Sequence, residues 1–405
     1  MMKSIPVWKQ ELSDGVHAAR LASLYCCSPA ETASEAARYA AVLDGLEKTF
    51  GSHAEAGLYS APGRTEIGGN HTDHQHGRVL AGSVNIDMIA AAAPNDKNQL
   101  RVQSEGYDLC VIDLNDLEAH KEEENTTAAL LRGECAAFTQ RGAKLAGLDV
   151  YISSNVPKGS GVSSSAAFEV LIGVILNDCF MTEKVSPIAI AQIGQWAENV
   201  YFGKPCGLMD QLASSTGGLV LFMDFRDPAA PLVRRLDAAL PGYALCVVDS
   251  GADHAGLTDA YAAIPRELGA VCRLFGAEVL RQVEEAEFYR RLPEVRRAAE
   301  DRAVLRAIHV FDENRRVLGQ VQALENGDTE GFLALVNDSG RSSWEYLQNI
   351  APEGAAGHQE LAVTLALCRR LLRGRGAARV HGGGFAGTAL CMVPGEDYPA
   401  FRAEL

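Results

Sequence analysis

One short stretch of small residues decides the predicted fold: Val156-Pro157-Lys158-Gly159-Ser160-Gly161-Val162-Ser163-Ser164-Ser165-Ala166-Ala167. The residues from Ser164 to Asp178 are strongly apolar, so the stretch is predicted to open a helix. Its small residues let a ligand approach the backbone, and the unpaired N–H groups of a helix N-terminus attract phosphate. The stretch contains neither Gly-Lys-Ser/Thr nor Gly-x-Gly-x-x-Gly. Taken alone, it is equally compatible with an ordinary flexible loop.

A second cluster concentrates polar residues among glycines: Ala61-Pro62-Gly63-Arg64-Thr65-Glu66-Ile67-Gly68-Gly69-Asn70-His71-Thr72-Asp73-His74-Gln75-His76-Gly77. Such a density of charged and histidine side chains is unusual both for a core and for a plain surface. The polar side chains suit hydrogen bonding to a polyol. Two alternatives stay open, a solvated turn and a metal site with the ligands His71, Asp73, His74 and His76.

A third cluster follows: Trp196-Ala197-Glu198-Asn199-Val200-Tyr201-Phe202-Gly203-Lys204-Pro205-Cys206-Gly207-Leu208-Met209-Asp210-Gln211. Glu198 is predicted on a helix, and Asp210 follows a Gly/Pro turn. Phosphoryl transfer requires a carboxylate to hold Mg²⁺ and often a second carboxylate to orient the attacking hydroxyl. In isolation, a surface Glu and a helix-capping Asp would be the simpler interpretation.

The composition is that of a globular protein, with 47% hydrophobic and 22% charged residues among 405. This length predicts two domains, and the Pro- and Asp-rich stretch 224–231 suggests domains at 1–225 and 226–405. The net charge of −15 disfavours nucleic acid and anionic lipid as partners. No apolar run reaches the ~18 residues of a membrane helix. Neither a signal peptide nor a cysteine motif is recognisable, so we expect a cytoplasmic protein with reduced thiols.

Helical and strand patterns are mixed without regular alternation, which predicts an α+β chain. Helices are predicted over 31–49, 127–139, 164–178, 187–201, within 258–337, and over 359–373. Strands are predicted over 58–60, 88–93, 108–114, 150–153, 219–223, 244–248 and 388–393.

In combination and in order, these clusters resemble the motifs of the GHMP small-molecule kinases, and among them most of all those of galactokinases. A glycine-rich match lies near the end of the chain: Arg379-Val380-His381-Gly382-Gly383-Gly384-Phe385-Ala386-Gly387. The resemblance implies an N-terminal mixed-sheet domain and a C-terminal domain of antiparallel sheet and helices, with the active site in a cleft between them. It also implies that ATP, with Mg²⁺, phosphorylates the C1 hydroxyl of a sugar, most simply galactose.

The resemblance implies roles for individual residues. Asp210 would be the catalytic base, and Arg64 would hold Asp210 ionised and steady the phosphoryl group. The implied sugar-binding residues are Asn70, His71, Asp73, Gly207 and Tyr261. The implied ATP-binding residues are Ser104, Lys158, Gly159, Ser160, Gly161, Val162, Ser163 and Ser164. The implied Mg²⁺ ligands are Ser165 and Glu198.

The sequence also departs from the galactokinase pattern, mostly at the sugar end. Asn70 replaces a usual Glu, Glu66 a usual Asn, and His74 a usual Tyr. Thr127 takes the position of a Trp near adenine, and Ala386 that of a glycine. Other substrates therefore stay open, namely arabinose, N-acetylgalactosamine or a uronic acid, as does a catalytically silent regulator that binds sugar and ATP. A metal-dependent hydrolase is the remote alternative. The sequence leaves the oligomeric state open, with a monomer as the simplest expectation.

Overall fold

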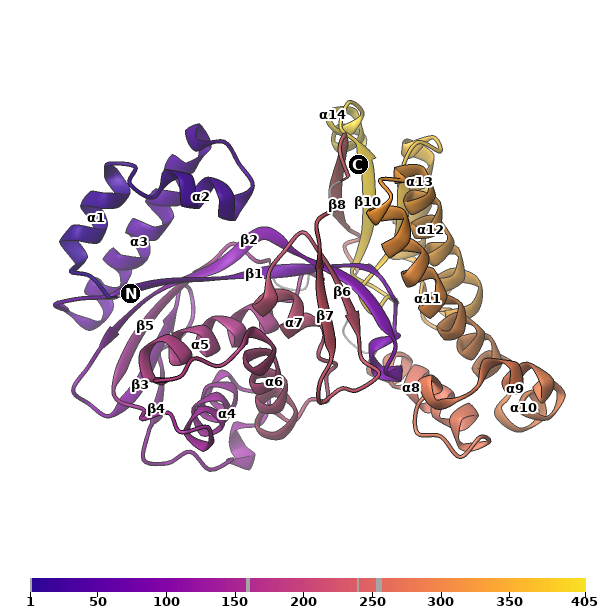
Figure 1. Ribbon diagram of the computed structural model, residues 1–405, viewed down its shortest axis with the longest axis horizontal. Coiled ribbons are helices and arrows are strands. Elements are labelled where there is room, and N and C mark those ends of the chain that lie inside the picture. The colour runs from indigo at the N-terminus through magenta and orange to yellow at the C-terminus, as the bar shows by residue number, and fades with distance from the viewer. Residues whose placement is uncertain (1, 158–160, 239, 253–256) are drawn as a thin grey trace. The chain divides into compact units, whose positions relative to one another are not determined.

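The computed structural model describes residues 2–157, 161–238, 240–252 and 257–405. It contains a mixed sheet, an antiparallel sheet and helices, which confirms the predicted α+β class (Figure 1). The chain forms two compact units. The first comprises Met1–Arg64, Ser83–Pro157 and Val162–Gly217, and the second comprises Thr65–Gly82, Lys158–Gly161 and Gly218–Leu405. Residues 65–82 therefore belong with the C-terminal part of the chain, although they precede the predicted boundary by far.

The first unit is built from helices around one part of the mixed sheet. Its helices are α1 (Ile5–Ser13), α2 (Ala18–Tyr25), α3 (Thr32–Phe50), α4 (Thr127–Gln140), α5 (Ser164–Phe180), α6 (Pro187–Ala197) and α7 (Met209–Thr216). Its strands are β3 (Gln99–Ser104), β4 (Cys110–Asp113), β5 (Leu148–Ser154) and parts of β1 (Gly57–Gly68) and β2 (Arg78–Pro94). The strand order in this unit is β4-β3-β5-β2, with β3 parallel to β5 and the other pairs antiparallel.

Small side chains allow α1 and α3 to pack on strand β2. Ile89, Ala91 and Ala93 of β2 are fully buried in one cluster with Val42 and Leu43 of α3. Every second residue of a strand points to the same face, so the alanines present a smooth surface on which a helix can lie closely. This cluster fixes strand β2, with which the strand that carries Arg64, β1, is paired.

Strand β1 is longer than predicted. The sequence predicted a strand only at 58–60, but β1 continues to Gly68 and carries Arg64 and Glu66 within it. Arg64, Thr65 and Glu66 are all buried. Because polar residues normally indicate a loop, hydrophobic periodicity could not reveal a strand whose buried polar side chains find distant partners.

The second unit carries a short antiparallel sheet and a layer of long helices. Its strands are β6 (Val220–Asp224), β7 (Leu232–Leu236), β8 (Tyr243–Asp249), β9 (Ala377–His381) and β10 (Thr388–Pro394). Its helices are α8 (Thr258–Arg273), α9 (Glu285–Arg290), α10 (Leu292–Ala299), α11 (Asp301–Glu325), α12 (Thr329–Ser342), α13 (Glu360–Leu372) and α14 (Tyr398–Glu404). Strands run in the order β8-β10-β9, while β6 lies between β7 and the first residues of β2.

Helix α11 is central to the second unit and buries an unusual set of polar side chains: Arg306, His309, Glu313, Asn314 and Gln320. Buried polar groups need hydrogen-bond partners. Such a helix is therefore a candidate support for a functional loop.

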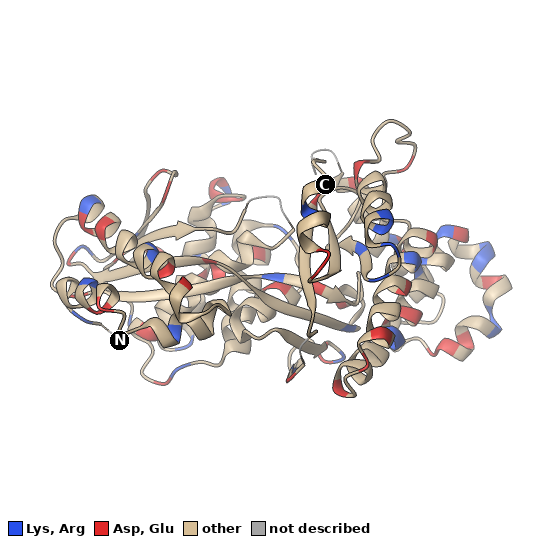
Figure 2. Cartoon of the chain, turned by 90° about the horizontal axis from the view of Figure 1, so that it is seen from above, with Lys and Arg blue, Asp and Glu red and all other residues tan. Residues whose placement is uncertain are grey.

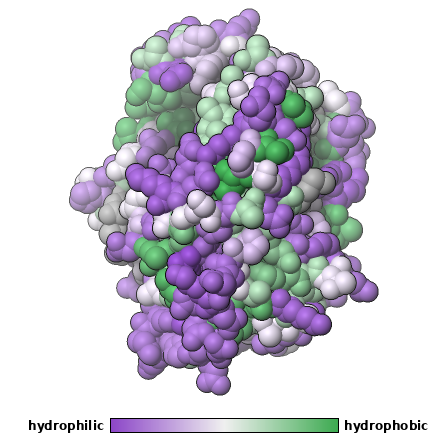
Figure 3. All heavy atoms as spheres, turned by 90° about the vertical axis from the view of Figure 1, so that its left-hand side faces the viewer, coloured by the Kyte–Doolittle hydropathy of each residue, from purple (hydrophilic) through white to green (hydrophobic). Residues whose placement is uncertain are grey.

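Acidic and basic residues are interspersed along the helices (Figure 2). Hydrophilic residues cover most of the face in Figure 3, with smaller apolar areas between them. No helix among the described residues has the length and apolar character needed to span a membrane. All ten cysteines are free thiols.

Candidate active site

A carboxylate–guanidinium pair forms the centre of the first group of candidate residues. Arg64 lies on β1, and Asp210 lies in the first turn of α7. Nε of Arg64 donates to Oδ1 of Asp210, and Nη2 donates to Oδ2, both at 2.6 Å. Two parallel charge-assisted hydrogen bonds fix the plane of the carboxylate as well as its position. The structure thus brings together the two residues that were predicted to be catalytic.

The glycine- and serine-rich stretch reaches the same carboxylate. Oγ of Ser163 donates to Oδ2 of Asp210 at 2.6 Å. The backbone N–H of Arg64 donates to the carbonyl of Val162 at 3.0 Å. A Cβ on Gly63 would lie 2.9 Å from that same carbonyl oxygen, so only glycine allows the stretch to lie this close to β1.

The N-terminus of α5 begins directly after Ser163, which has a left-handed φ of 59°. Ser164 is the first helical residue, and the exposed Ser165 follows it. N–H groups of a first helical turn have no partner within the helix, so this turn can bind an anion. Three predicted ATP-binding residues lie outside the described residues, and their roles stay predictions: Lys158, Gly159 and Ser160.

A buried acid lies at the end of α6. Glu198 begins a short π-helical turn, and its side chain is only 6% exposed. Nε2 of Gln211 donates to Oε2 of Glu198 at 3.2 Å and to Oε2 of Glu169 at 2.9 Å. Nζ of Lys204 lies 3.5 Å from Oε1 of Glu198. Gln211 follows Asp210 in the chain, so one amide connects Glu198 to the helix of the predicted base.

The buried acids near Glu198, namely Glu169 and Glu134, have raised pKa values. Burial raises the pKa of Glu169 well above its usual range, and the negative charge of Glu198 raises it further. Burial also raises the pKa of Glu134, with a smaller contribution from Glu169. Desolvation thus favours the neutral forms of Glu134 and Glu169, so three like charges do not accumulate here.

The donor chemistry of Ser165 and Glu198 fits Mg²⁺, which prefers hard oxygen ligands such as a hydroxyl and a carboxylate. Within the described part of the chain, no three His, Cys, Asp or Glu side chains are grouped to hold a metal ion. Mg²⁺ commonly takes only one or two protein ligands and completes its coordination with water and substrate phosphates. The residues therefore suit a cation that arrives with a nucleotide.

Two further predicted residues lie in the first unit, one at the end of a strand and one just before a helix. Ser104 ends β3. Gly207 lies in the irregular segment that leads into α7, and the backbone of the preceding residue is anchored by two hydrogen bonds. The N–H of Cys206 donates to Oδ1 of Asn199 at 2.8 Å, and the carbonyl of Cys206 accepts from Nε2 of Gln195 at 3.1 Å. The backbone of Gly207 is thus held in place beside Asp210.

The second group gathers around the three residues Gly382–Gly384, named here the glycine turn. Nδ2 of Asn70 donates to the first carbonyl of the turn at 2.7 Å. Nε2 of His71 donates to the second carbonyl at 2.9 Å. The hydroxyl of Tyr261 donates to the third carbonyl at 2.6 Å. Three of the predicted sugar-binding residues therefore meet within the second unit.

His71 and Tyr261 are uncharged hydrogen-bonding groups. Burial lowers the pKa of His71 to about 4, so its imidazole is neutral at pH 7. Because Nε2 of this neutral ring is the donor, Nδ1 is an acceptor. Burial raises the pKa of Tyr261 to about 12, and its ring packs edge-on against Phe385 at 5.3 Å between centroids.

Asp73 lies at the start of a short 3₁₀ turn, Asp73–Gln75, with a side chain that is 13% exposed. Its Oδ1 accepts from the N–H of His74 at 2.9 Å. The metal site that the sequence left open as an alternative for this loop finds no support, since the described residues contain no group of three ligands suited to a metal ion.

Glu313 of helix α11 supports this loop, although its sequence neighbourhood indicates no role for it. Its Oε1 accepts from the N–H of Gly69 at 3.0 Å and of Asn70 at 3.4 Å. Burial alone would raise its pKa, but Arg316 and His309 overcome this effect and lower the pKa to about 2. Glu313 is fully buried although the surrounding sequence is charged. Only its hydrogen bond to the loop at Gly69, which lies over 240 residues away in the sequence, identifies Glu313 as a supporting residue.

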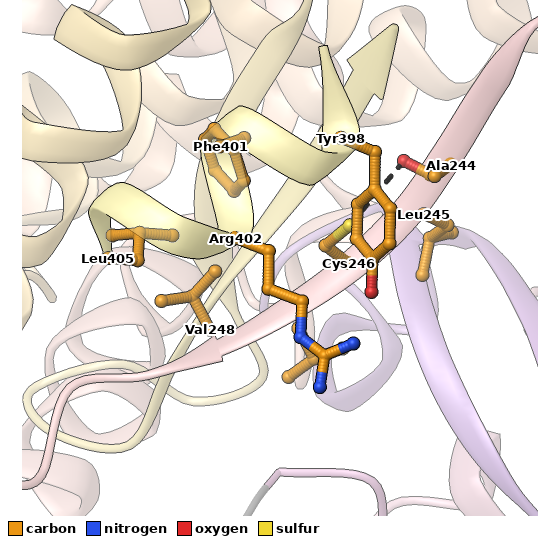
Figure 4. Close-up of a pocket in the computed structure, with 9 residues that line it drawn as sticks. Ala244, Leu245, Cys246, Val248, Tyr398, Phe401, Arg402 and Leu405 are labelled. Carbon is orange, nitrogen blue, oxygen red and sulfur yellow. Dashed lines mark hydrogen bonds between the residues drawn. The ribbon is translucent and has the colours of Figure 1, made fainter. Parts of the chain in front are cut away.

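A pocket of about 480 Å³ also lies in the second unit, beside strand β8 (Figure 4). Tyr398, Phe401 and Arg402 of α14 line it together with residues 244–248. None of the described candidate residues lines this pocket. We therefore do not assign it to the candidate site.

Two family models match the chain. Residues 128–218 match the GHMP kinases N terminal domain, and residues 46–94 match the galactokinase galactose-binding signature. A galactokinase of Streptomyces coelicolor is 32% identical over 350 residues, which cover 86% of this chain and 87% of that protein. A galactokinase of Actinobacillus pleuropneumoniae serotype 3 is 33% identical over 84% of this chain and 86% of its own.

Solved structures show the same fold. Lactococcus lactis galactokinase, crystallised with galactose, superposes with a TM-score of 0.77 at 24% identity, covering 89% of this chain and 91% of that one. A mevalonate kinase superposes with a TM-score of 0.60 at 13% identity, over 86% of this chain and 94% of its own.

Proposed function

The chain belongs to the galactokinase family of GHMP kinases, and from this premise we propose that it transfers the γ-phosphoryl group of ATP to the anomeric hydroxyl of galactose. One observation supports the proposal most strongly. The carboxylate of Asp210 is bound both by Arg64 and by Ser163, which immediately precedes the N-terminus of α5. A candidate base is thus in contact with a candidate phosphate-binding turn.

In the proposed reaction, the anomeric oxygen of the sugar attacks the γ-phosphorus of ATP. A new oxygen–phosphorus bond forms, the bond between the γ-phosphorus and the bridging oxygen of ADP breaks, and the hydroxyl proton passes to Asp210. The transition state of phosphoryl transfer is loose, so a carboxylate suffices as the base when it is well positioned. The two hydrogen bonds from Arg64 provide that positioning.

The proposed roles of the other residues follow from their hydrogen-bonding chemistry. We assign sugar binding to His71, Asp73, Tyr261 and the backbone of Gly207. We assign ATP binding to Ser104, Gly161, Val162, Ser163 and Ser164, together with Lys158, Gly159 and Ser160. Ser165 and Glu198 would hold Mg²⁺, which neutralises charge on the phosphates when bound. We also propose a cytoplasmic location for this enzyme.

The test is an ADP-release assay with galactose, arabinose, glucose, N-acetylgalactosamine and galacturonate. We expect galactose to give the highest kcat/KM, and we expect Asp210→Asn to lose most of the turnover while staying folded. Efficient turnover of another sugar instead of galactose would refute the substrate. Binding of sugar and ATP without turnover would show that the chain is a silent regulator.

A further inference from the structure

All three carbonyls of the glycine turn accept hydrogen bonds from side chains. Asn70, His71 and Tyr261 donate to the first, second and third carbonyl, respectively. Nδ2 of Asn349 adds a second donor to the middle carbonyl at 3.1 Å. Such ties give one defined geometry to a segment that would otherwise be flexible because of its glycines.

Asn70 uses its whole hydrogen-bonding capacity within the protein. Its side chain is fully buried. Nδ2 donates to the first carbonyl of the glycine turn at 2.7 Å and to Oε1 of Glu66 at 3.0 Å. Oδ1 accepts from Nδ2 of Asn349 at 2.9 Å and from Oγ of Ser343 at 3.2 Å. An amide has two donor hydrogens and two acceptor lone pairs, so these four bonds saturate it.

The surroundings require an amide at this position. Nδ2 of Asn70 faces two acceptors, a backbone carbonyl and the carboxylate of Glu66. If a carboxylate replaced the amide, its oxygen would face these two oxygens without a proton between them. Nη2 of Arg379 donates to Oε1 of Glu66 at 2.5 Å and fixes that carboxylate. An acid at residue 70 would therefore lose two hydrogen bonds and place a second buried charge beside Glu66.

The backbone of Asn70 is anchored as firmly as its side chain. Nε2 of His309 bonds to the carbonyl of Asn70 at 3.0 Å, while Glu313 accepts from its N–H. Both partners lie on α11 and are fully buried. The position of His71, the next residue, therefore depends on this network.

We propose that Asn70 is a positioning residue and not a ligand of the sugar: it holds the glycine turn against residues 66–71 and thereby sets the positions of His71 and Tyr261. The proposal rests on the proposed function for its activity readout. It reassigns a residue whose sequence position had suggested a direct contact with a sugar hydroxyl.

The decisive experiment compares the wild type with Asn70→Asp, which keeps the shape of the side chain and removes its donor. Steady-state kinetics are measured with galactose and with 2-, 3-, 4- and 6-deoxygalactose. For a positioning residue, we expect kcat/KM to fall about tenfold or more, by a common factor for all five sugars, because lost buried hydrogen bonds disturb the whole site. If one deoxy sugar is unaffected by Asn70→Asp while the others lose activity, Asn70 contacts the missing hydroxyl and the proposal is wrong.

Asn314→Asp is the matched control. Asn314 is a buried amide on α11 whose Nδ2 donates to the carbonyl of Val310 and whose Oδ1 accepts from the N–H of Arg78. It has the same bonding roles but no bond to the glycine turn. We expect this variant to lose thermal stability with little change in the KM for galactose. An equal rise in KM in both variants would overturn the specific role of Asn70.

A double-mutant cycle tests the network without relying on turnover. Thermal unfolding is measured for the wild type, Asn70→Asp, Glu66→Gln and the double variant, in which the amide and the acid exchange places. We expect the double variant to be more stable than the sum of the two single effects predicts, since the amide introduced by Glu66→Gln can donate to the carboxylate introduced by Asn70→Asp. Strict additivity would refute the network. A wild type that does not phosphorylate galactose would instead refute the proposed function and leave this cycle informative.

If Asn70→Asp does not fold, Ser343→Ala removes only the weakest of the four bonds, at 3.2 Å. It is expected to raise the KM for galactose and for each deoxy sugar by one modest common factor. Selective tolerance of one deoxy sugar would contradict the proposal here as well.

Discussion

Replacing Arg64 by Lys separates the charge of this residue from its forked geometry. Arg64 makes two hydrogen bonds of 2.6 Å to Asp210, one to each carboxylate oxygen. A lysine ammonium keeps the positive charge but cannot make this planar, two-pronged contact. The side chain of Asp210 is 28% exposed and that of Arg64 only 9%, so the pair is partly shielded from water. Losing one charge-assisted hydrogen bond costs about 1.5–3 kcal/mol. When this whole loss is felt in the transition state, kcat falls about 10- to 160-fold.

The chain offers a matched control for this substitution. Arg101 makes the same two-pronged contact with Asp149, again with two hydrogen bonds of 2.6 Å, between strands β3 and β5. We expect both Arg→Lys variants to lower the Tm, but only Arg64→Lys to lower kcat strongly, while Arg101→Lys stays within about twofold of wild type. Stopped-time ADP release and thermal unfolding measure the two effects. The same loss of kcat in both variants, or a wild-type kcat in Arg64→Lys, would refute a catalytic role for the paired hydrogen bonds between Arg64 and Asp210.

Two further predictions concern Mg²⁺ and pH. Glu198→Gln removes an anionic oxygen but keeps the shape of a buried side chain. The Mg²⁺ concentration for half-maximal rate should therefore rise about tenfold, with little change in the KM for galactose. An unchanged Mg²⁺ titration would show that Glu198 is not a ligand. His71 has a folded-state pKa of about 4, below its ordinary value of 6.5, so the unfolded chain binds more protons between these pH values. The free energy of unfolding should therefore fall as the pH is lowered from about 6.5 to about 4, and His71→Gln should flatten this dependence. His309 contributes with the same sign. A stability profile that His71→Gln leaves unchanged would contradict the burial of a neutral His71.

The sequence predicts helices best where apolar periodicity is strong. Helices α3, α4 and α5 begin within one residue of their predicted starts, because each has a continuous apolar face. Helix α6 was predicted as part of one helix over 187–201, whereas the last turn is π-helical from Glu198. Strand β1 was predicted too short, since its second half buries polar residues whose hydrogen-bond partners, such as Asp210 and Arg379, lie far away in the sequence.

The candidate site was predicted as a set of residues but not as a network. The three clusters include Arg64, Asp210 and Ser163, and the structure joins them around one carboxylate. Gln211 was quoted without a role, because nothing in its neighbourhood shows that its amide faces two buried acids.

The roles of residues around the predicted sugar-binding site could not be predicted, because their hydrogen-bond partners are distant in the sequence. Asn70 was noticed as a departure from the family pattern, but two of its partners, Ser343 and Asn349, lie more than 270 residues away. Glu313 had no local signal at all, because a charged residue on a charged helix normally faces water. Contacts with residues distant in the sequence determine the roles of Asn70 and Glu313, and the local sequence does not reveal these contacts.

The position of the transferred phosphate tests the central claim most directly. The product of galactose, ATP and Mg²⁺ is examined by ³¹P NMR with coupling to the sugar protons. The account predicts one new phosphomonoester that couples to the anomeric proton, formed by the wild type and lost with Asp210→Asn. A phosphate on any other hydroxyl, or undiminished formation of the 1-phosphate by Asp210→Asn, would contradict the account.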